Sequence, residues 1–180
     1  YDEDTCELTL SGQGVLESSY YSMDYVKSIV IKEGITSIGD DVFASYHVLQ
    51  SVTLPNNLLS IGDSAFSYCN LSSIVIPDSV TSIGDNAFEG CDSLQNVTLS
   101  NRLHSIGNYA FSDCSRLSSI VIPNSVTTIG DYAFDWCWVD EITLSDGLVT
   151  IGEGAFEGCS LTKVNIPKTV KKIGDNAFSG

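Results

Sequence analysis

Basic residues and long apolar segments are scarce in this sequence. Eight lysines and arginines stand against 23 aspartates and glutamates, which gives the 180 residues a formal charge of −15. A chain this acidic is repelled by phosphate backbones and by anionic lipid surfaces. Apolar runs such as Ile29-Val30-Ile31 are far shorter than the roughly 20 residues that span a bilayer. We therefore expect no nucleic-acid partner and no membrane insertion.

Histidines number two and prolines four, whereas apolar residues make up 43% of the chain. That apolar fraction, without a long block of like charge, predicts a folded core rather than disorder. The charge is uneven, because residues 163–180 hold four lysines and one aspartate, a net of +3, and the preceding residues therefore carry −18. We interpret the acidic part as a surface that keeps molecules apart in solution.

The tripeptide Ile-Gly-Asp, or a near variant, recurs at intervals of 22 or 23 residues. Its copies begin at Ile38, Ile61, Ile83, Ile106, Ile129, Ile151 and Ile173. In each copy an apolar residue, usually Ala, and then Phe follow, as in Ala87-Phe88. Five copies place a cysteine three positions after the Phe, at Cys69, Cys91, Cys114, Cys137 and Cys159. Such a fixed period indicates a repeat architecture.

An apolar-x-x-apolar-x-apolar segment follows the cysteine position and predicts a short β-strand. In Val97-Thr98-Leu99 the two apolar residues share one face and Thr98 takes the other. β-Branched residues fill most of the equivalent triplets, as strands prefer. Proline cannot donate to a ladder, so it ends a strand. It follows four of the triplets, as Pro55, Pro77, Pro123 and Pro167.

An acidic residue follows the glycine in most repeats. The aspartates at this place are Asp40, Asp63, Asp85, Asp131 and Asp175. Each precedes a short apolar turn that ends in Phe, so each occupies the position of a helix N-cap. Together with Glu153 they could instead chelate calcium, but calcium takes six to eight oxygens and one carboxylate per repeat supplies too few. We therefore favour capping of turns or short helices, and expect no metal.

One repeat cannot bury its own apolar side chains, but stacked repeats can. Seven parallel strands, counted from Ile29-Val30-Ile31 at about 4.8 Å per strand, would make a sheet roughly 29 Å across. We expect one elongated solenoid, with an N-terminal cap in residues 1–25 and repeats in residues 26–180. The last copy stops at Gly180, before its cysteine and strand. We therefore expect the repeats to be truncated there, with more sequence beyond or self-association through the uncapped end.

Written from Leu94, the unit reads L-x-x-V-x-L-x-x-x-L-x-x-I-G-x-x-A-F-x-x-C. It resembles the BspA-like class of leucine-rich repeats over about residues 26–180, with Pro-x-Ser or Pro-x-Asn where ordinary repeats carry Asn or Cys. The resemblance implies an α/β leucine-rich-repeat solenoid, or horseshoe, with short parallel strands on the concave face and turns or short helices on the convex face. It also implies a bacterial or protist protein, secreted or at the cell surface, that attaches to host proteins, matrix or other cells.

Six cysteines raise the question of disulfides or a metal site. Five share one repeat position and should stand in a line, with Cβ atoms near 5 Å apart, whereas a disulfide needs about 3.5–4.5 Å. Such a line does not converge on a zinc ion either. Small buried thiols are the better interpretation. Cys6, in the cap, has no evident partner in the sequence.

The sequence offers little for catalysis. His47 and His104 fall at different places in the repeat and should not meet. No G-x-S-x-G elbow, H-E-x-x-H pair or phosphate-binding glycine loop is present in the sequence. Regular stacking places the carboxylates in solvent, where their pKa values are not shifted for acid–base work. We expect a protein that is not an enzyme and needs no cofactor.

In each predicted strand, the residue between the two inward apolar residues faces outward. With their outward neighbours, the candidate ligand-binding residues are Thr53, Val75, Asn96, Thr98, Ser119, Val121, Glu141 and Thr143. They form a flat, mildly polar concave face, open to a protein or glycan ligand on another cell or matrix. The alternative is that Thr and Val simply suit an exposed sheet.

One repeat breaks the pattern, with Trp136 and Trp138 on either side of Cys137. Tyr109 and Tyr132 precede the Ala-Phe pairs of adjacent repeats and should stack. Exposed aromatic residues are enriched in binding hot spots, so these two tryptophans and two tyrosines are further candidate binding residues. Either tryptophan could instead cover a thin part of the repeat.

The leading functional hypothesis is extracellular adhesion or protein recognition through the concave face. The alternatives are a passive spacer or targeting module of a larger surface enzyme, and an intracellular scaffold, which the line of reduced cysteines permits. Two N-glycosylation sequons, which begin at Asn70 and Asn96, matter only if the source is a eukaryote.

Overall fold

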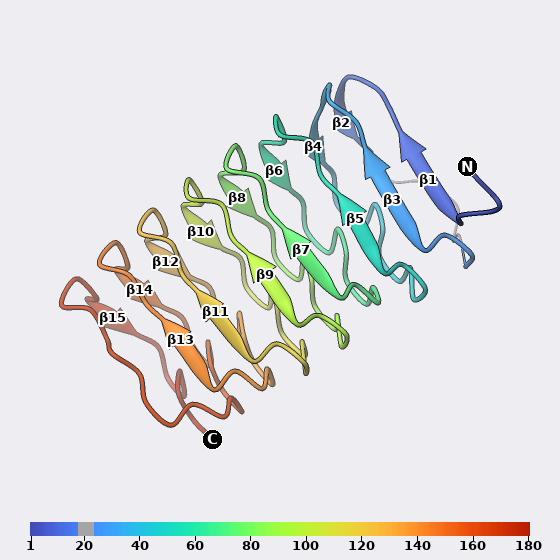
Figure 1. Cartoon of the computed structure of the whole chain (residues 1–180). Coiled ribbons are helices and arrows are strands. Elements are labelled where there is room, and N and C mark those ends of the chain that lie inside the picture. The colour runs from blue at the N-terminus through green and yellow to red at the C-terminus, as the bar shows by residue number, and fades with distance from the viewer. Residues whose placement is uncertain (18–23) are drawn as a thin grey trace.

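The computed structural model describes residues 1–17 and 24–180, which form a β-solenoid. Figure 1 shows its strands in two rows along a stack of turns, with β1 and β15 near opposite ends. All pairs of named strands are parallel, and each repeat contributes a strand to each row except the last, which contributes only β15. These residues include no helix that is long and apolar enough to cross a membrane.

The first row consists of the strands predicted from the apolar triplets, together with one strand of the cap. These strands are β1 (Glu7–Leu10), β3 (Ser28–Ile31), β5 (Ser51–Thr53), β7 (Ser73–Val75), β9 (Asn96–Thr98), β11 (Ser119–Val121) and β13 (Glu141–Thr143). They are hydrogen-bonded in the groups β1-β3-β5, β7-β9 and β11-β13. β1 lies in the segment expected to be the N-terminal cap and pairs with β3 of the first repeat. The triplet 164–166 is not a strand, so the prediction of a seventh strand there is wrong.

The second row was not predicted. It is one continuous eight-stranded sheet, which includes the isoleucine of each Ile-Gly pair. Its strands are β2 (Gly14–Leu16), β4 (Ile35–Ile38), β6 (Ser60–Ile61), β8 (Ser82–Ile83), β10 (Ser105–Ile106), β12 (Thr128–Ile129), β14 (Thr150–Ile151) and β15 (Lys172–Ile173). Close packing explains why glycine follows each of these isoleucines. A Cβ on Gly107, for example, would lie 2.5 Å from the backbone of Gly84. The repeats therefore approach so closely that a side chain does not fit.

The third side of the repeat contains the segments expected to be turns or short helices. They run from the acidic position to the cysteine position, over residues 40–46, 63–69, 85–91, 108–114, 131–137 and 153–159. An α-helix bonds each N–H to a carbonyl four residues earlier in the same segment. Here the Phe66 N–H instead donates to the Ala87 carbonyl of the next repeat at 2.8 Å, and the Phe88 N–H donates to Ala110 at 2.8 Å. The segments are turns hydrogen-bonded between repeats.

The expectation of short helices is therefore wrong, and within the described residues the solenoid is all-β rather than α/β. Two positions per repeat on the third side have positive φ, as at Ser64 and Tyr68, and a right-handed helix does not tolerate them. The aspartates cap no helix. Instead the carboxylate of one repeat accepts from the backbone N–H of the next, as Asp40 Oδ1 does from Asp63 at 2.8 Å. The horseshoe curvature stays a prediction, so we refer to the strand faces by row.

Two ladders of identical side chains run through the core. Seven phenylalanines stack with ring centroids 5.1–5.4 Å apart, from Phe43 to Phe178. Beside them, each cysteine of the line donates from Sγ to the Phe carbonyl of the preceding repeat, as Cys69 does to Phe43 at 3.1 Å. All six cysteines are free, and four of them are fully buried. The prediction of small buried thiols is confirmed for these four, whereas Cys159 is only partly buried.

Candidate binding surface

The outward side chains of the first row form one continuous face. In β7 and β11 the central isoleucine is buried, whereas Val75 and Val121 are each 66% exposed. Register places Val75 opposite Thr98 and Val121 opposite Thr143. Thr53, Asn96, Ser119 and Glu141 are exposed on the same face. We call these eight residues the first-row face. They are the candidate ligand-binding residues of the strands that the sequence analysis identified.

The first-row face is shallow, with open hollows rather than a closed pocket. A hollow of about 550 Å³ is lined by Glu141, Thr143, Lys163 and Asn165, among others. Another, of about 450 Å³, extends from Val121 toward the turn at Pro123. Short polar side chains and isolated apolar ones alternate here, an arrangement that suits contact with a macromolecule better than enclosure of a small molecule.

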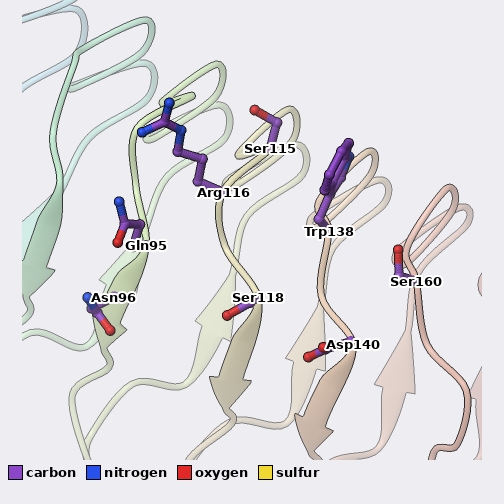
Figure 2. A pocket seen from close by; sticks show the side chains of 8 residues that line it. All are labelled: Gln95, Asn96, Ser115, Arg116, Ser118, Trp138, Asp140 and Ser160. Atoms are coloured by element: carbon purple, nitrogen blue, oxygen red, sulfur yellow. The ribbon is translucent and has the colours of Figure 1, made fainter.

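A separate groove of about 720 Å³ lies where the chain enters the first-row strands. It is lined by Gln95, Asn96, Ser115, Arg116, Ser118, Trp138, Asp140 and Ser160. Figure 2 shows Asn96, Ser118 and Asp140 at the strand starts, and Trp138, Arg116 and Ser115 on the loops beside them. We call it the strand-entry groove. Sequence analysis selected Asn96 and Trp138 and missed the other six, because the groove is formed only when loops of adjacent repeats come together.

The two tryptophans lie in different environments. Both remain exposed, Trp138 to 67% and Trp136 to 61%. Trp138 lines the strand-entry groove, whereas the Trp136 ring lies beside Gly158 of the next repeat, where an added Cβ would come within 3.2 Å of it. The contact with Gly158 favours the covering role for Trp136 over Trp138, although most of the Trp136 surface stays exposed. The predicted stacking of Tyr109 on Tyr132 is confirmed, with centroids 5.1 Å apart and planes 9° from parallel.

Rings that cover glycines recur on the third side. Tyr68 lies against Gly90 and Tyr132 against Gly154, as Trp136 does against Gly158. In each pair the aromatic residue precedes the glycine by 22 positions, which is one repeat, and this spacing is the signal that could have found the contact in the sequence. These rings thus have a packing role, which weakens the case for Tyr132 and Trp136 as ligand contacts.

Acidic side chains gather beside these rings. Tyr132 donates to Glu153 at 2.7 Å, which raises the pKa of Tyr132 to about 12. The pKa of Asp135 is raised to about 6, first by burial and then by Glu157 and Asp113. One Asp135 oxygen is buried without a hydrogen-bond partner in the described part of the chain. No group of three metal-binding side chains that could hold an ion occurs in residues 1–17 and 24–180.

The two histidines do not meet. His47 Nδ1 lies 3.0 Å from the Tyr68 carbonyl on the third side, whereas His104 immediately precedes β10 in the second row. The sequon asparagines also differ: Asn70 accepts from the Ser93 hydroxyl, whereas Asn96 is exposed in the strand-entry groove. Glycosylation at either asparagine stays a prediction.

Comparison with known proteins decides the family. The sequence pattern described as BspA type Leucine rich repeat region matches residues 15–138 and 104–180, in six copies. The chain belongs to this BspA-type family. Repeats of this family typically mediate protein interactions and are generally not catalytic. No curated protein matches the chain in sequence.

Solved structures agree with the BspA-type assignment. A leucine-rich repeat protein from Bacteroides ovatus superposes with a TM-score of 0.85 at 29% identity, over 93% of this chain and 45% of that one. The leucine-rich repeat protein of T. pallidum superposes with a TM-score of 0.79 at 28% identity, over 87% of this chain and 78% of that one. The pneumococcal vaccine antigen PcpA shares the fold, with a TM-score of 0.68 at 19% identity, over 96% of this chain and 69% of that one. The chain spans less than half the length of the Bacteroides protein.

Proposed function

We propose that this BspA-type chain is a non-catalytic adhesion module, secreted or at a cell surface, that recognises a protein ligand through the first-row face. The observation that carries the proposal is the pair of valines Val75 and Val121. Each leaves two thirds of its surface in water while the adjacent isoleucine is buried, so neither is required by the core. In a protein interface, such side chains would provide apolar contact area among polar neighbours.

The shape of the molecule supports the same function. Stacked repeats produce an extended surface on which one outward position recurs at each step, and repeat proteins use such surfaces to bind partners. The first-row face continues across β5 to β13, from Thr53 to Thr143. A partner can therefore contact several repeats at once, with apolar contacts at Val75 and Val121 and hydrogen bonds to Thr98, Thr143 and their neighbours.

Charge limits the class of ligand. The residues before 163 carry a net charge of −18, and Glu141 lies within the first-row face. A ligand surface that is neutral to basic complements this potential, whereas an acidic one is repelled. We therefore propose a protein whose contact surface carries Lys or Arg, with an association rate that falls as salt is added.

Binding of the purified chain to arrayed matrix and serum proteins at physiological salt tests the proposal. Thr98→Lys with Thr143→Lys places two long cations on the first-row face and should abolish saturable binding. Ser82→Lys is the matched control, because Ser82 is an exposed strand residue of the second row. Binding to none of the arrayed proteins would favour the alternative role, a spacer or targeting module.

A further inference from the structure

The strand-entry groove has a chemical composition different from that of the first-row face. Its lining comes from four consecutive repeats, beginning with Gln95 and ending with Ser160. Three repeat steps at about 4.8 Å make the groove roughly 14 Å long. A groove of this length, with a volume of about 720 Å³, accommodates a short chain of linked units rather than one small molecule.

Trp138 supplies the one large apolar surface of the groove. Its indole is 67% exposed and stands on the loop before β13, with Ser160 on the next loop (Figure 2). Trp136 is almost as exposed, at 61%, but its ring lies beside Gly158 and does not line the groove. Exposing an indole to water costs free energy that folding does not recover. A ligand with a flat apolar face would recover it.

The polar side chains of the groove are free to bind. Gln95, Asn96, Arg116 and Asp140 form no side-chain hydrogen bond or ion pair with any residue that the structure describes. Together they offer amide donors and acceptors, a guanidinium and a carboxylate along one wall. Such a set matches hydroxyl groups, which donate and accept at the same time.

Taken together, these features favour a sugar over a peptide or a polyanion. A pyranose has a face of C–H groups that can lie on an indole and a rim of hydroxyls for the amides and charged groups. A protein hot spot needs several anchors in desolvated pockets, and this groove has a single aromatic side chain and is open. A sulfated or sialylated glycan would meet Asp140 and a chain of net charge −15.

We propose that the strand-entry groove binds a short neutral oligosaccharide, with one sugar ring on Trp138 and hydroxyls bound by Gln95, Arg116 and Asp140. The site is distinct from the proposed protein-binding face except at Asn96, which belongs to both. The charged side chains Arg116 and Asp140 act here through hydrogen bonds to a neutral ligand, so the affinity changes little with added salt.

Fluorescence titration with neutral trisaccharides tests the proposal. The chain has two tryptophans, so in the Trp136→Ala variant Trp138 is the sole indole reporter. The probes are cellotriose, chitotriose, mannotriose and laminaritriose. We expect at least one to change the Trp138 emission saturably. In calorimetry, Trp138→Ala should weaken the affinity for that sugar by roughly tenfold or more, whereas Trp136→Ala should leave the affinity within about twofold of the wild-type value.

Two results of the sugar titrations would overturn the inference. One is that none of the four sugars binds the wild-type chain. The other is that a sugar binds and Trp138→Ala leaves its affinity unchanged. If Trp138→Ala lost the binding of a protein ligand but not of a sugar, the groove would be assigned to protein recognition, and the inference would likewise be overturned. The Val121→Lys variant keeps the two proposals apart, because it alters the first-row face and should bind the sugar as the wild type does.

Discussion

The thiol of Cys114 donates a hydrogen bond to the carbonyl oxygen of Phe88, in the preceding repeat, at 3.3 Å. The same contact recurs at each cysteine of the line, so the column of thiols joins one repeat to the one before it. Burial raises the pKa of Cys69 to about 12 and that of Cys114 well above its ordinary value. The Cys69 and Cys114 thiols therefore remain protonated donors at neutral pH.

Removal of one thiol should cost stability. Cys114→Ala deletes a buried atom and the donor to Phe88, and we expect a loss of about 1–2 kcal/mol in the free energy of unfolding. Cys114→Ser keeps a donor, so part of the hydrogen-bond contribution should remain. Urea denaturation measures both variants. Equal stability of Cys114→Ala and the wild type would show that the contact with Phe88 contributes nothing.

Thiol reactivity gives an independent measure of the same column. In the folded protein at pH 8, Ellman's reagent should modify Cys6, which is partly exposed, before the buried Cys69, Cys91, Cys114 and Cys137. The buried thiols should react only after addition of denaturant. Rapid native-state labelling of all six cysteines would contradict the packing described for the core.

The aspartate ladder predicts a difference between two conservative changes. Asp63 Oδ1 accepts from the Asp85 N–H at 2.8 Å, and Asn108 makes the same contact naturally with Asp131. We expect Asp63→Ala to lose about 1–2 kcal/mol and Asp63→Asn to lose much less, because an amide oxygen can replace the carboxylate. Added EDTA should leave the Tm unchanged in all three proteins. A Tm that falls with EDTA would restore the calcium hypothesis.

Gly90 should tolerate no side chain. Its φ is +66°, and a Cβ would lie 2.4 Å from the Tyr68 ring. We expect Gly90→Ala to lose about 1–3 kcal/mol, partly from backbone strain and partly from displacement of the ring. In a Tyr68→Ala background only the backbone cost should remain. Gly12→Ala is the matched control, since its Cβ would meet Ile35 at an ordinary 3.9 Å. Equal losses for Gly90→Ala in both backgrounds would contradict the ring contact.

Asp135 predicts how stability depends on pH. Its folded pKa is raised from 3.8 to about 6, so the folded state holds the proton more tightly than the unfolded chain. The contribution to stability is therefore fully present below about pH 3.8 and is lost as the pH rises through 6. Asp135→Asn should raise stability at pH 7.5 by no more than about 1 kcal/mol after solvent screening, and barely at pH 4.

Asp146→Asn, a change of an exposed carboxylate, controls for the altered net charge. The measurement is the Tm of each protein at the two pH values. A gain for Asp135→Asn that is the same at pH 4 and pH 7.5 would show that burial of the Asp135 carboxylate is not its cause.

Much of the solenoid could be predicted because its information lies within single repeats. The 22- to 23-residue period, the stacked Phe and Cys positions and the outward direction of Val75 and Thr98 all follow from spacing and alternation. The second row could not be found in this way, since a two-residue strand such as Ser60–Ile61 is too short for any period to show.

The third side was misread because local rules favour a helix there. Asp40 followed by an apolar turn is a plausible N-cap, but the N–H groups of Phe43 and Phe66 find acceptors in the next repeat. Hydrogen bonds between repeats thus replaced those within the segment. The strand-entry groove was missed for a related reason: Gln95, Arg116 and Trp138 become neighbours only when three repeats are stacked.

The most direct test of the central claim is a side-by-side titration of one arrayed protein ligand against three variants. We predict that Val75→Lys with Val121→Lys abolishes binding, while Trp138→Ala and Ser82→Lys bind as the wild type does, with all three variants folded by circular dichroism. Binding that survives the two valine changes and disappears in Trp138→Ala would contradict recognition of a protein through the first-row face.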